Sequence, residues 1–261
     1  MAGPITHLKS FFDRLKWLSP MMGGVLKTAL HLIKIRGNPL GMGTAQYHNI
    51  HFEFRNCDST AVKEVLIDEE YDFLSAFLKS CPAPIIIDIG AHIGTFSLWV
   101  YHQNPKARML MIEANPASHK ILSHNVAKAF PENQYKILNK AAWKNNDVLK
   151  FSTAGDSMGN KISPDGDIEV DGITFVEIVE MATENTPSID LMKIDIEGAE
   201  EAFFETADQA LDRVKNLVIE LHPKSCDTDS VINKLKKRYK NIHEISERID
   251  SKPVLYCTDP S

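Results

Sequence analysis

The stretch Pro84-Ile-Ile-Ile-Asp-Ile-Gly-Ala-His-Ile-Gly-Thr-Phe-Ser97 determines how the rest of the chain is interpreted. Ile85 to Ile89 is a short apolar run between a proline and a glycine, which is typical of a strand buried on both faces of a parallel sheet. Gly90 and Gly94 then predict a tight turn. Residues 95–102 are apolar at helical spacing, so we expect a helix directly after the turn.

A second buried strand follows at Met109 to Ile112 and ends in Glu113, about 20 residues after the glycines. An acid at that place can accept hydrogen bonds from both hydroxyls of a ribose. The spacing Gly90-x-x-x-Gly94 differs from the Gly-x-Gly-x-x-Gly of dinucleotide folds, and Asp88 precedes it. A carboxylate there is a poor neighbour for a pyrophosphate and a good one for a cation. S-adenosylmethionine carries a sulfonium and an ammonium group and no phosphate, so it fits this pattern.

Two segments resemble a known family. Asp88–Gly94 with Glu113–Pro116 is similar to the first two motifs of class I S-adenosylmethionine-dependent methyltransferases, and Leu191-Met-Lys-Ile-Asp-Ile-Glu-Gly-Ala-Glu200 is similar to the signature of the FkbM methyltransferases. The resemblance covers Tyr71 to Leu221. It implies an α/β fold with a Rossmann-like seven-stranded sheet and helices on both faces. Residues 242–245 and 254–257 would form its closing antiparallel pair.

The spacing and the resemblance together predict a set of cofactor-binding residues. In this superfamily the loop after the third strand, here 135–138, borders the adenine. Ala141 and Ala142 would provide a flat wall there, although they could equally be small core residues. The full predicted set is Asp88, Gly90, Ala91, His92, Gly94, Thr95, Glu113, Ala114, Asn115, Ala141 and Ala142.

Candidate catalytic residues follow the fourth and fifth predicted strands, at 189–194 and 216–221. Ligands of open α/β sheets bind beyond the carboxyl ends of the strands. Methyl transfer to a hydroxyl needs a base, and Asp195, Glu197 and His222 are the candidates. Asp195, Glu220 and His222 could instead hold a divalent cation that acidifies the acceptor. We favour a base without a metal.

The composition fits one domain of ordinary size with an N-terminal extension. The chain has 261 residues, 43% of them hydrophobic, and a net charge of −6. A nucleic-acid partner would favour a basic chain. The four cysteines lie far apart, which predicts reduced thiols in a cytoplasmic protein and no zinc site.

We divide the chain into an N-terminal extension, residues 1–60, and a methyltransferase domain, residues 61–261. Helices are expected at 5–18 and 21–35, separated by Ser19-Pro20, as a cap or a homodimer contact. Residues 21–35 are too short and too charged to form a transmembrane segment. They could lie on a membrane surface, but packing on the core or on a second subunit is favoured.

A β insertion is predicted at about 147–180, before the fourth core strand. Strand-like runs at 148–152, 168–170 and 174–179 alternate with turn residues, and Asp171-Gly172 is a hairpin signal. Inserted loops at the ligand edge commonly carry substrate contacts.

These observations predict an S-adenosylmethionine-dependent methyltransferase. The resemblance implies O-methylation of a sugar hydroxyl or a secondary metabolite, and hence a small-molecule or carbohydrate acceptor. Three other functions stay open: an N-methyltransferase acting on an amino sugar, a non-catalytic cofactor-binding or interaction module, and a nicotinamide-dependent oxidoreductase. The missing third glycine weakens the last of these.

Overall fold

A mixed seven-stranded sheet forms the centre of the computed structural model, which describes residues 4–153, 161–184, 186–245 and 252–260. The strand order is β12-β13-β11-β10-β3-β4-β5, in which only β13 runs antiparallel to its neighbours. This confirms the predicted fold class. The strands are β3 (Ile85–Ile89), β4 (Arg108–Ile112), β5 (Tyr135–Leu138), β10 (Leu191–Ile194), β11 (Leu217–Glu220), β12 (Tyr239–Glu244) and β13 (Val254–Pro260).

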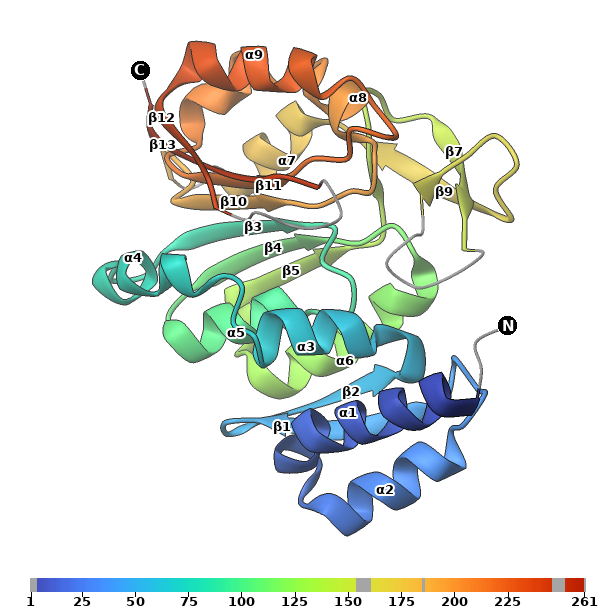
Figure 1. Cartoon of the computed structure of the whole chain (residues 1–261). Helices are drawn as coiled ribbons and strands as arrows, with labels where there is room; N and C mark the ends of the chain where they lie inside the picture. The colour runs from blue at the N-terminus through green and yellow to red at the C-terminus, as the bar shows by residue number, and fades with distance from the viewer. Residues whose placement is uncertain (1–3, 154–160, 185, 246–251, 261) are drawn as a thin grey trace.

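Helices cover both faces of this sheet (Figure 1). One face carries α3 (Ser59–Leu66), α4 (Ser75–Ser80), α5 (Thr95–Gln103) and α6 (Pro116–Ala129), and the other carries α7 (Phe175–Ala182), α8 (Glu200–Phe204) and α9 (Thr228–Arg238). Each face has its own hydrophobic cluster, because the central strands point alternate side chains to opposite sides. Short 3-10 helices in the described residues connect these elements: η1 (Asn56–Asp58), η2 (Asp72–Leu74), η3 (Glu132–Gln134) and η5 (Ala210–Arg213).

The N-terminal helices differ from the prediction in where they divide. α1 (Pro4–Met22) continues through Pro20, and α2 (Val25–Lys34) begins only after Gly23 and Gly24. Both glycines have positive φ, 83° and 113°, which is the left-handed region that ends a helix at little cost. The break therefore follows the glycines and not the proline. No helix in the described ranges is both long enough and apolar enough to cross a bilayer.

A hairpin of β1 (Met42–Tyr47) and β2 (Ile50–Arg55) lies between these helices and the main domain (Figure 1). Asn125 of α6 joins it to the core: its fully buried amide accepts from Glu53 N at 2.7 Å and donates to the carbonyl oxygens of Glu53 and Ile93, each at 2.9 Å. One hydrophobic cluster contains residues from both sides of residue 60. The division of the chain at that residue stays a prediction.

The inserted segment forms a four-stranded sheet in the order β6-β9-β7-β8. Its strands are β6 (Ala141–Ala142), β7 (Val148–Ser152), β8 (Lys161–Ile162) and β9 (Ile168–Ile173). The structure corrects two details. β9 runs through Asp171-Gly172, where a hairpin turn was expected, and residues 175–179, which were expected in a strand, belong to helix α7. Thr174 and Glu177 form a capping box at the start of α7. The loop at 154–160 lies outside the described residues.

We expect Asn125→Ala to lower the free energy of unfolding by about 2–4 kcal/mol. The change would remove the partner of a buried carbonyl of Ile93 and of two part-buried backbone groups of Glu53, and a buried group left unpaired costs about 1–3 kcal/mol. Urea unfolding followed by circular dichroism measures this loss. Asn49→Ala, at an exposed position in the hairpin turn, serves as the control. Equal midpoints for the two variants would contradict the assigned role of Asn125.

Candidate active site

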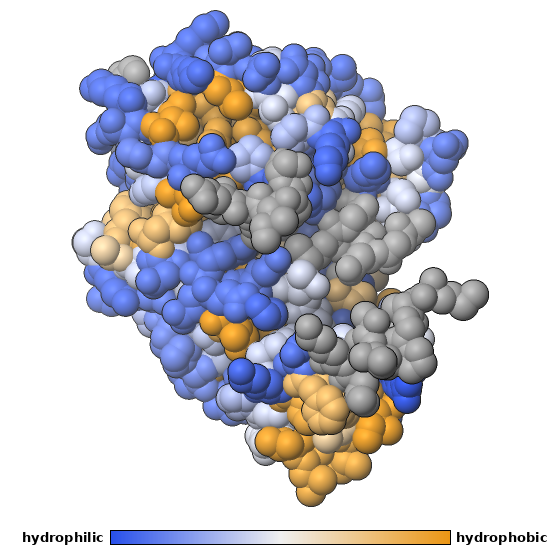
Figure 2. Space-filling model, viewed as in Figure 1, coloured by the Kyte–Doolittle hydropathy of each residue, from blue (hydrophilic) through white to orange (hydrophobic). Residues whose placement is uncertain are grey.

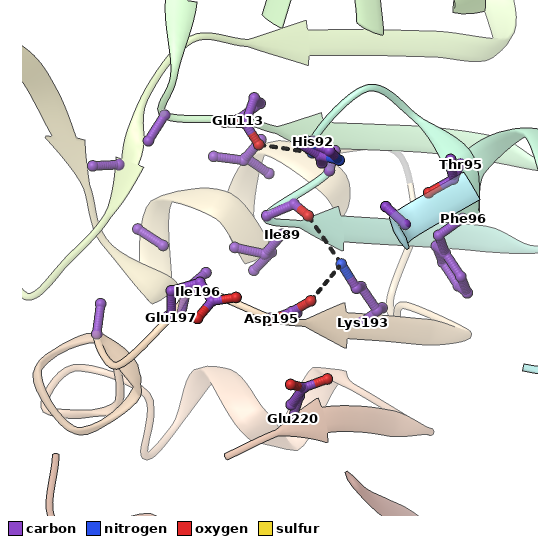
Figure 3. Close-up of a pocket in the computed structure, with 18 of the residues that line it drawn as sticks. Ile89, His92, Thr95, Phe96, Glu113, Lys193, Asp195, Ile196, Glu197 and Glu220 are labelled. Carbon is purple, nitrogen blue, oxygen red and sulfur yellow. Dashed lines mark hydrogen bonds and ion pairs between the residues drawn. The ribbon is translucent and has the colours of Figure 1, made fainter. Parts of the chain in front are cut away.

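A cavity lies at the carboxyl edge of the sheet, where β3 and β10 meet. The chain runs from β3 to β4 and β5 on one side and later returns to β10 and β11 on the other, so this is the point at which the strand order reverses. The cavity is open to solvent, and its volume, including the open part, is about 990 Å³. Its walls come from α3 and the segment after it, the turn after β3, the end of β4, the insertion, and the ends of β10 and β11. Figure 3 labels lining residues from the turn after β3 and from the ends of β4, β10 and β11.

The turn after β3 is held directly against the end of β10. Gly90 has φ +75°, and a side chain in place of its hydrogen would collide with the carbonyl oxygen of Asp195. The ammonium group of Lys193 donates to the carbonyl oxygen of Gly90 at 2.9 Å. The glycine is therefore needed for this close approach of two backbones as well as for the turn.

Lys193 is itself buried between carboxylates. Its Nζ lies 3.4 Å from Asp88 Oδ1 and 3.9 Å from Asp195 Oδ2. Figure 3 shows the lysine reaching from β10 toward the turn after β3. Burial would lower the pKa of Lys193, but the charges of Asp88 and Asp195 outweigh it and raise the pKa above its ordinary value. The ammonium group therefore stays charged and links the two strand ends.

Glu113, at the end of β4, presents a carboxylate that is already oriented. Oε2 accepts from the backbone N–H of His92 at 2.7 Å, and Oε1 accepts from that of Asn115 at 2.8 Å. Burial raises the pKa of Glu113, although the nearby His92 and these two backbone donors act in the opposite direction. Each carboxylate oxygen can accept more than one hydrogen bond, so Glu113 has capacity for two hydroxyls of a ligand.

A buried ion pair that the sequence analysis missed supports the same turn. Asp58 accepts from Arg55 Nε and Nη2 at 2.9 and 2.8 Å, and its Oδ1 lies 3.1 Å from Nε2 of His92. Burial would raise the pKa of Asp58, but the hydrogen bonds from His92 and Arg55 lower it well below its usual range. The pair follows β2, far from the glycine turn in sequence, so only the folded chain brings it there.

His222, just after β11, is surrounded by four carboxylates. Its Nδ1 lies 2.6 Å from Glu200, and its Nε2 lies 3.2 Å from Glu197, 3.6 Å from Glu220 and 3.9 Å from Asp195. Burial would lower the pKa of His222, but the hydrogen bonds with Glu197 and Glu200 outweigh it and raise the pKa to about 10. The imidazole is then a cation at neutral pH, held between acids.

The same geometry could hold a divalent cation. Ligand atoms of Asp195, Glu220 and His222 lie within 4.8 Å of one another. Carboxylate oxygens and an imidazole nitrogen suit several divalent metals. A metal would compete with the proton on Nε2 of His222 for this place.

Most of the predicted site residues line the cavity. From the predicted cofactor set these are Gly90, Ala91, His92, Thr95, Glu113, Ala114, Ala141 and Ala142, and from the catalytic set Asp195 and Glu197, with Glu220 beside them. Glu197 reaches the cavity from a left-handed backbone conformation, φ 51°, and not from the extended chain that its spacing from Asp195 suggested.

Four predicted residues lie behind the wall. Asp88 accepts from Ser97 Oγ at 2.8 Å and pairs with Lys193. Gly94 caps the start of α5, and the Asn115 side chain caps α6 by accepting from Ala117 N at 2.8 Å. His222 contacts the carboxylates and not the cavity. These residues support the site from outside the surface that a ligand would touch.

The sequence analysis did not identify several lining residues. α3 and the segment after it contribute Glu64, Val65, Glu70 and Tyr71, and the insertion contributes Phe151 and Ile162. Lys193 lies in the quoted signature, where a charge within an apolar strand was the available signal.

Comparisons with known proteins give the following similarities. The family model for the methyltransferase FkbM domain matches residues 88–242. Methyltransferase sdnD of Sordaria araneosa is 27% identical over 199 residues, which cover 60% of this chain and 72% of that protein. Magnesium protoporphyrin IX methyltransferase from Synechocystis PCC 6803, solved with bound S-adenosylmethionine, is 11% identical with a TM-score of 0.45, over 76% of this chain and 83% of that chain. Human methyltransferase-like protein 13, in complex with S-adenosylhomocysteine, is 13% identical with a TM-score of 0.43, over 73% and 81%.

The raised pKa of His222 predicts a pH-dependent stability. The pKa rises from 6.5 to about 10 on folding, so the stabilisation is complete below pH 6.5 and is lost as pH rises toward 10. We expect the unfolding free energy to fall by up to about 1.4 kcal/mol per pH unit across this window. Urea titrations at several pH values measure the slope. It should flatten in His222→Gln and persist in His124→Gln, which changes an exposed histidine. Equal slopes for wild type and His222→Gln would contradict the assignment.

Proposed function

The chain belongs to the FkbM methyltransferase family and acts as an S-adenosylmethionine-dependent methyltransferase, and we propose that its acceptor is a hydroxyl group of a carbohydrate or other small molecule. The observation that supports this proposal is the position of the Asp195 carboxylate. Its carboxylate lines the cavity, and Oδ1 has no hydrogen-bond partner among the described residues. A carboxylate so placed can take the proton of a hydroxyl.

The cavity residues fit the cofactor chemically. Glu113 offers lone pairs to the two ribose hydroxyls, and Ala141 and Ala142 offer an apolar wall beside an adenine. The carboxylates beyond them suit the positively charged end of the molecule. When bound, the cofactor supplies a methyl group on a sulfonium that is already activated for transfer to the acceptor oxygen. The chain then has to align that oxygen with the methyl carbon and exclude water.

In this proposal Asp195 is the base and His222 is a positioning residue. A protonated imidazole cannot accept the acceptor proton, and the pKa of His222 near 10 keeps it protonated at neutral pH. Glu197 is paired with Lys252 at 3.3 Å and with His222 at 3.2 Å, so its carboxylate is less available to accept a proton from the acceptor. Asp195 would therefore accept the hydroxyl proton as the methyl group passes from the sulfonium sulfur to the acceptor oxygen, which leaves the cofactor as a neutral thioether, and would later release the proton to solvent.

We further propose that this step needs no divalent cation. Lys193, Lys252 and the imidazolium of His222 already provide positive charge among the carboxylates. A metal at Asp195, Glu220 and His222 would have to displace the proton from His222. The alternative is a metal-dependent enzyme in which the cation, and not Asp195, acidifies the acceptor.

A second candidate is N-methylation of an amino sugar. The cavity is lined by Glu64, Glu70, Asp195, Glu197 and Glu220, against the cations Lys140 and Lys193. An acidic wall attracts an ammonium group and repels an anionic acceptor. The same Asp195 would take the proton that an amine must lose before it attacks.

Two measurements test the function as a whole. Calorimetry should show binding of S-adenosylhomocysteine and none of NAD. Incubation of the protein with a host extract and methyl-labelled cofactor should then label a small molecule, and mass spectrometry of the product separates O-methyl from N-methyl. Binding without any labelled product would favour the non-catalytic module.

Glu113→Ala should weaken S-adenosylhomocysteine binding by about 10- to 150-fold. Hydrogen bonds to a charged acceptor contribute about 1.5–3 kcal/mol, and the variant removes that acceptor. Calorimetry measures the dissociation constant, and circular dichroism confirms the fold. Glu132→Ala, at an exposed position, is the control. Unchanged affinity in a folded Glu113→Ala protein would refute the role of this carboxylate.

Asp195→Asn should lower turnover by about two to four powers of ten and change cofactor affinity less, because a lost general base affects the transfer step. Asp208→Asn, at an exposed position, should behave as wild type. Chelator should leave wild-type activity unchanged. Loss of activity with EDTA and recovery with magnesium or manganese would instead show a cation at the site. Near-normal turnover of Asp195→Asn would place the base elsewhere.

A further inference from the structure

The largest gathering of exposed apolar side chains lies at the N-terminal end of the molecule, away from the cavity. Seven of the ten large hydrophobic side chains that are exposed in the described residues fall within residues 12–42. Figure 2 shows this surface as the orange region over α2. We define the α2 patch as Val25, Leu26, Leu30, Ile33, Leu40 and Met42.

We propose that the α2 patch docks onto the surface of an anionic lipid bilayer. α2 is fixed to the protein by its opposite side, where Thr28, Leu32 and the following Ile35 are buried against α1 and the hairpin. Its outward side is nevertheless apolar, with Leu26 75% exposed. A helix that is apolar on both sides in this way has a second surface to cover.

Basic residues border the patch in the arrangement of an interfacial helix. At roughly 100° per residue, Lys27 and Lys34 fall together at the edge of the exposed apolar side of α2. Arg36 follows directly, and all three are exposed. Such side chains can lie along apolar surface while their charged ends reach lipid phosphates. The ten residues of α2 would lie in the plane of the interface.

The charge of the whole extension points to the same partner. Residues 1–40 contain six lysines and arginines and one aspartate, a net charge of +5, whereas the whole chain carries −6. The remaining residues therefore carry −11. An anionic bilayer attracts the N-terminal end of such a molecule and repels the rest, so the charge distribution also orients the protein on the membrane.

A second copy of the chain fits this surface less well. A two-fold dimer through the α2 patch would place the same surface on both subunits and bring one +5 extension against another. Like charges across an interface disfavour association. An anionic lipid surface has no such conflict, so we assign the patch to lipid and not to the homodimer contact that the sequence allowed.

Co-sedimentation of the full chain with vesicles tests this proposal. We expect binding to phosphatidylcholine vesicles containing 30% phosphatidylserine (roughly one anionic headgroup in three) and at least tenfold weaker binding to pure phosphatidylcholine. Raising the salt concentration should weaken the binding. Leu26→Gln with Leu30→Gln should reduce it at least tenfold, and Lys27→Glu with Lys34→Glu should reduce it to the level seen with neutral vesicles.

Matched controls distinguish binding through the α2 patch from nonspecific hydrophobic binding and from misfolding. Val148→Gln changes an exposed apolar side chain on the insertion and should leave vesicle binding unchanged. All variants should keep S-adenosylhomocysteine affinity, since none lies in the cavity. Absence of binding to anionic vesicles would overturn the proposal. A dimer in light scattering that Leu26→Gln with Leu30→Gln abolishes would also overturn it and assign the patch to a second copy.

Discussion

The site depends on the interactions of the buried ammonium group of Lys193. It lies on β10 and reaches the turn after β3, where it binds the carbonyl oxygen of Gly90 and pairs with Asp88. These two strands come from distant parts of the chain and meet where the strand order reverses. A buried charge without partners would cost several kcal/mol, so the lysine and its acids are stable only together. This mutual requirement fixes the edge of the sheet at which the cavity forms.

The carboxylates beyond Lys193 extend the same arrangement toward β11. His222 contacts acids from the ends of both β10 and β11, and Glu200 from the start of α8 holds its other nitrogen. His222, which does not line the cavity, thus contacts carboxylates that do. Methyl transfer from a sulfonium depends more on alignment than on chemical assistance, and an edge held by buried ion pairs provides fixed positions for that alignment.

The sequence analysis predicted the features that depend on local sequence patterns. The strand β3, its glycine turn and Glu113 were found because apolar runs and glycines identify them directly, and most of the predicted cofactor residues line the cavity. Two kinds of feature were missed. α1 continues through Pro20, where a break was expected, and ends instead at the glycines that follow it. The helix at 175–182 begins at a capping box, within a run that had been interpreted as a strand. The ion pair of Arg55 and Asp58 and the wall from α3 depend on non-local packing, which periodicity does not report.

The close contact between Gly90 and Asp195 has a consequence for how the two strand ends respond to change. The turn after β3 and the end of β10 are in direct backbone contact, and Lys193 joins them by a hydrogen bond to the carbonyl oxygen of Gly90. A substitution that displaces one of these strand ends would therefore displace the other, so a change outside the cavity would alter two of its walls together.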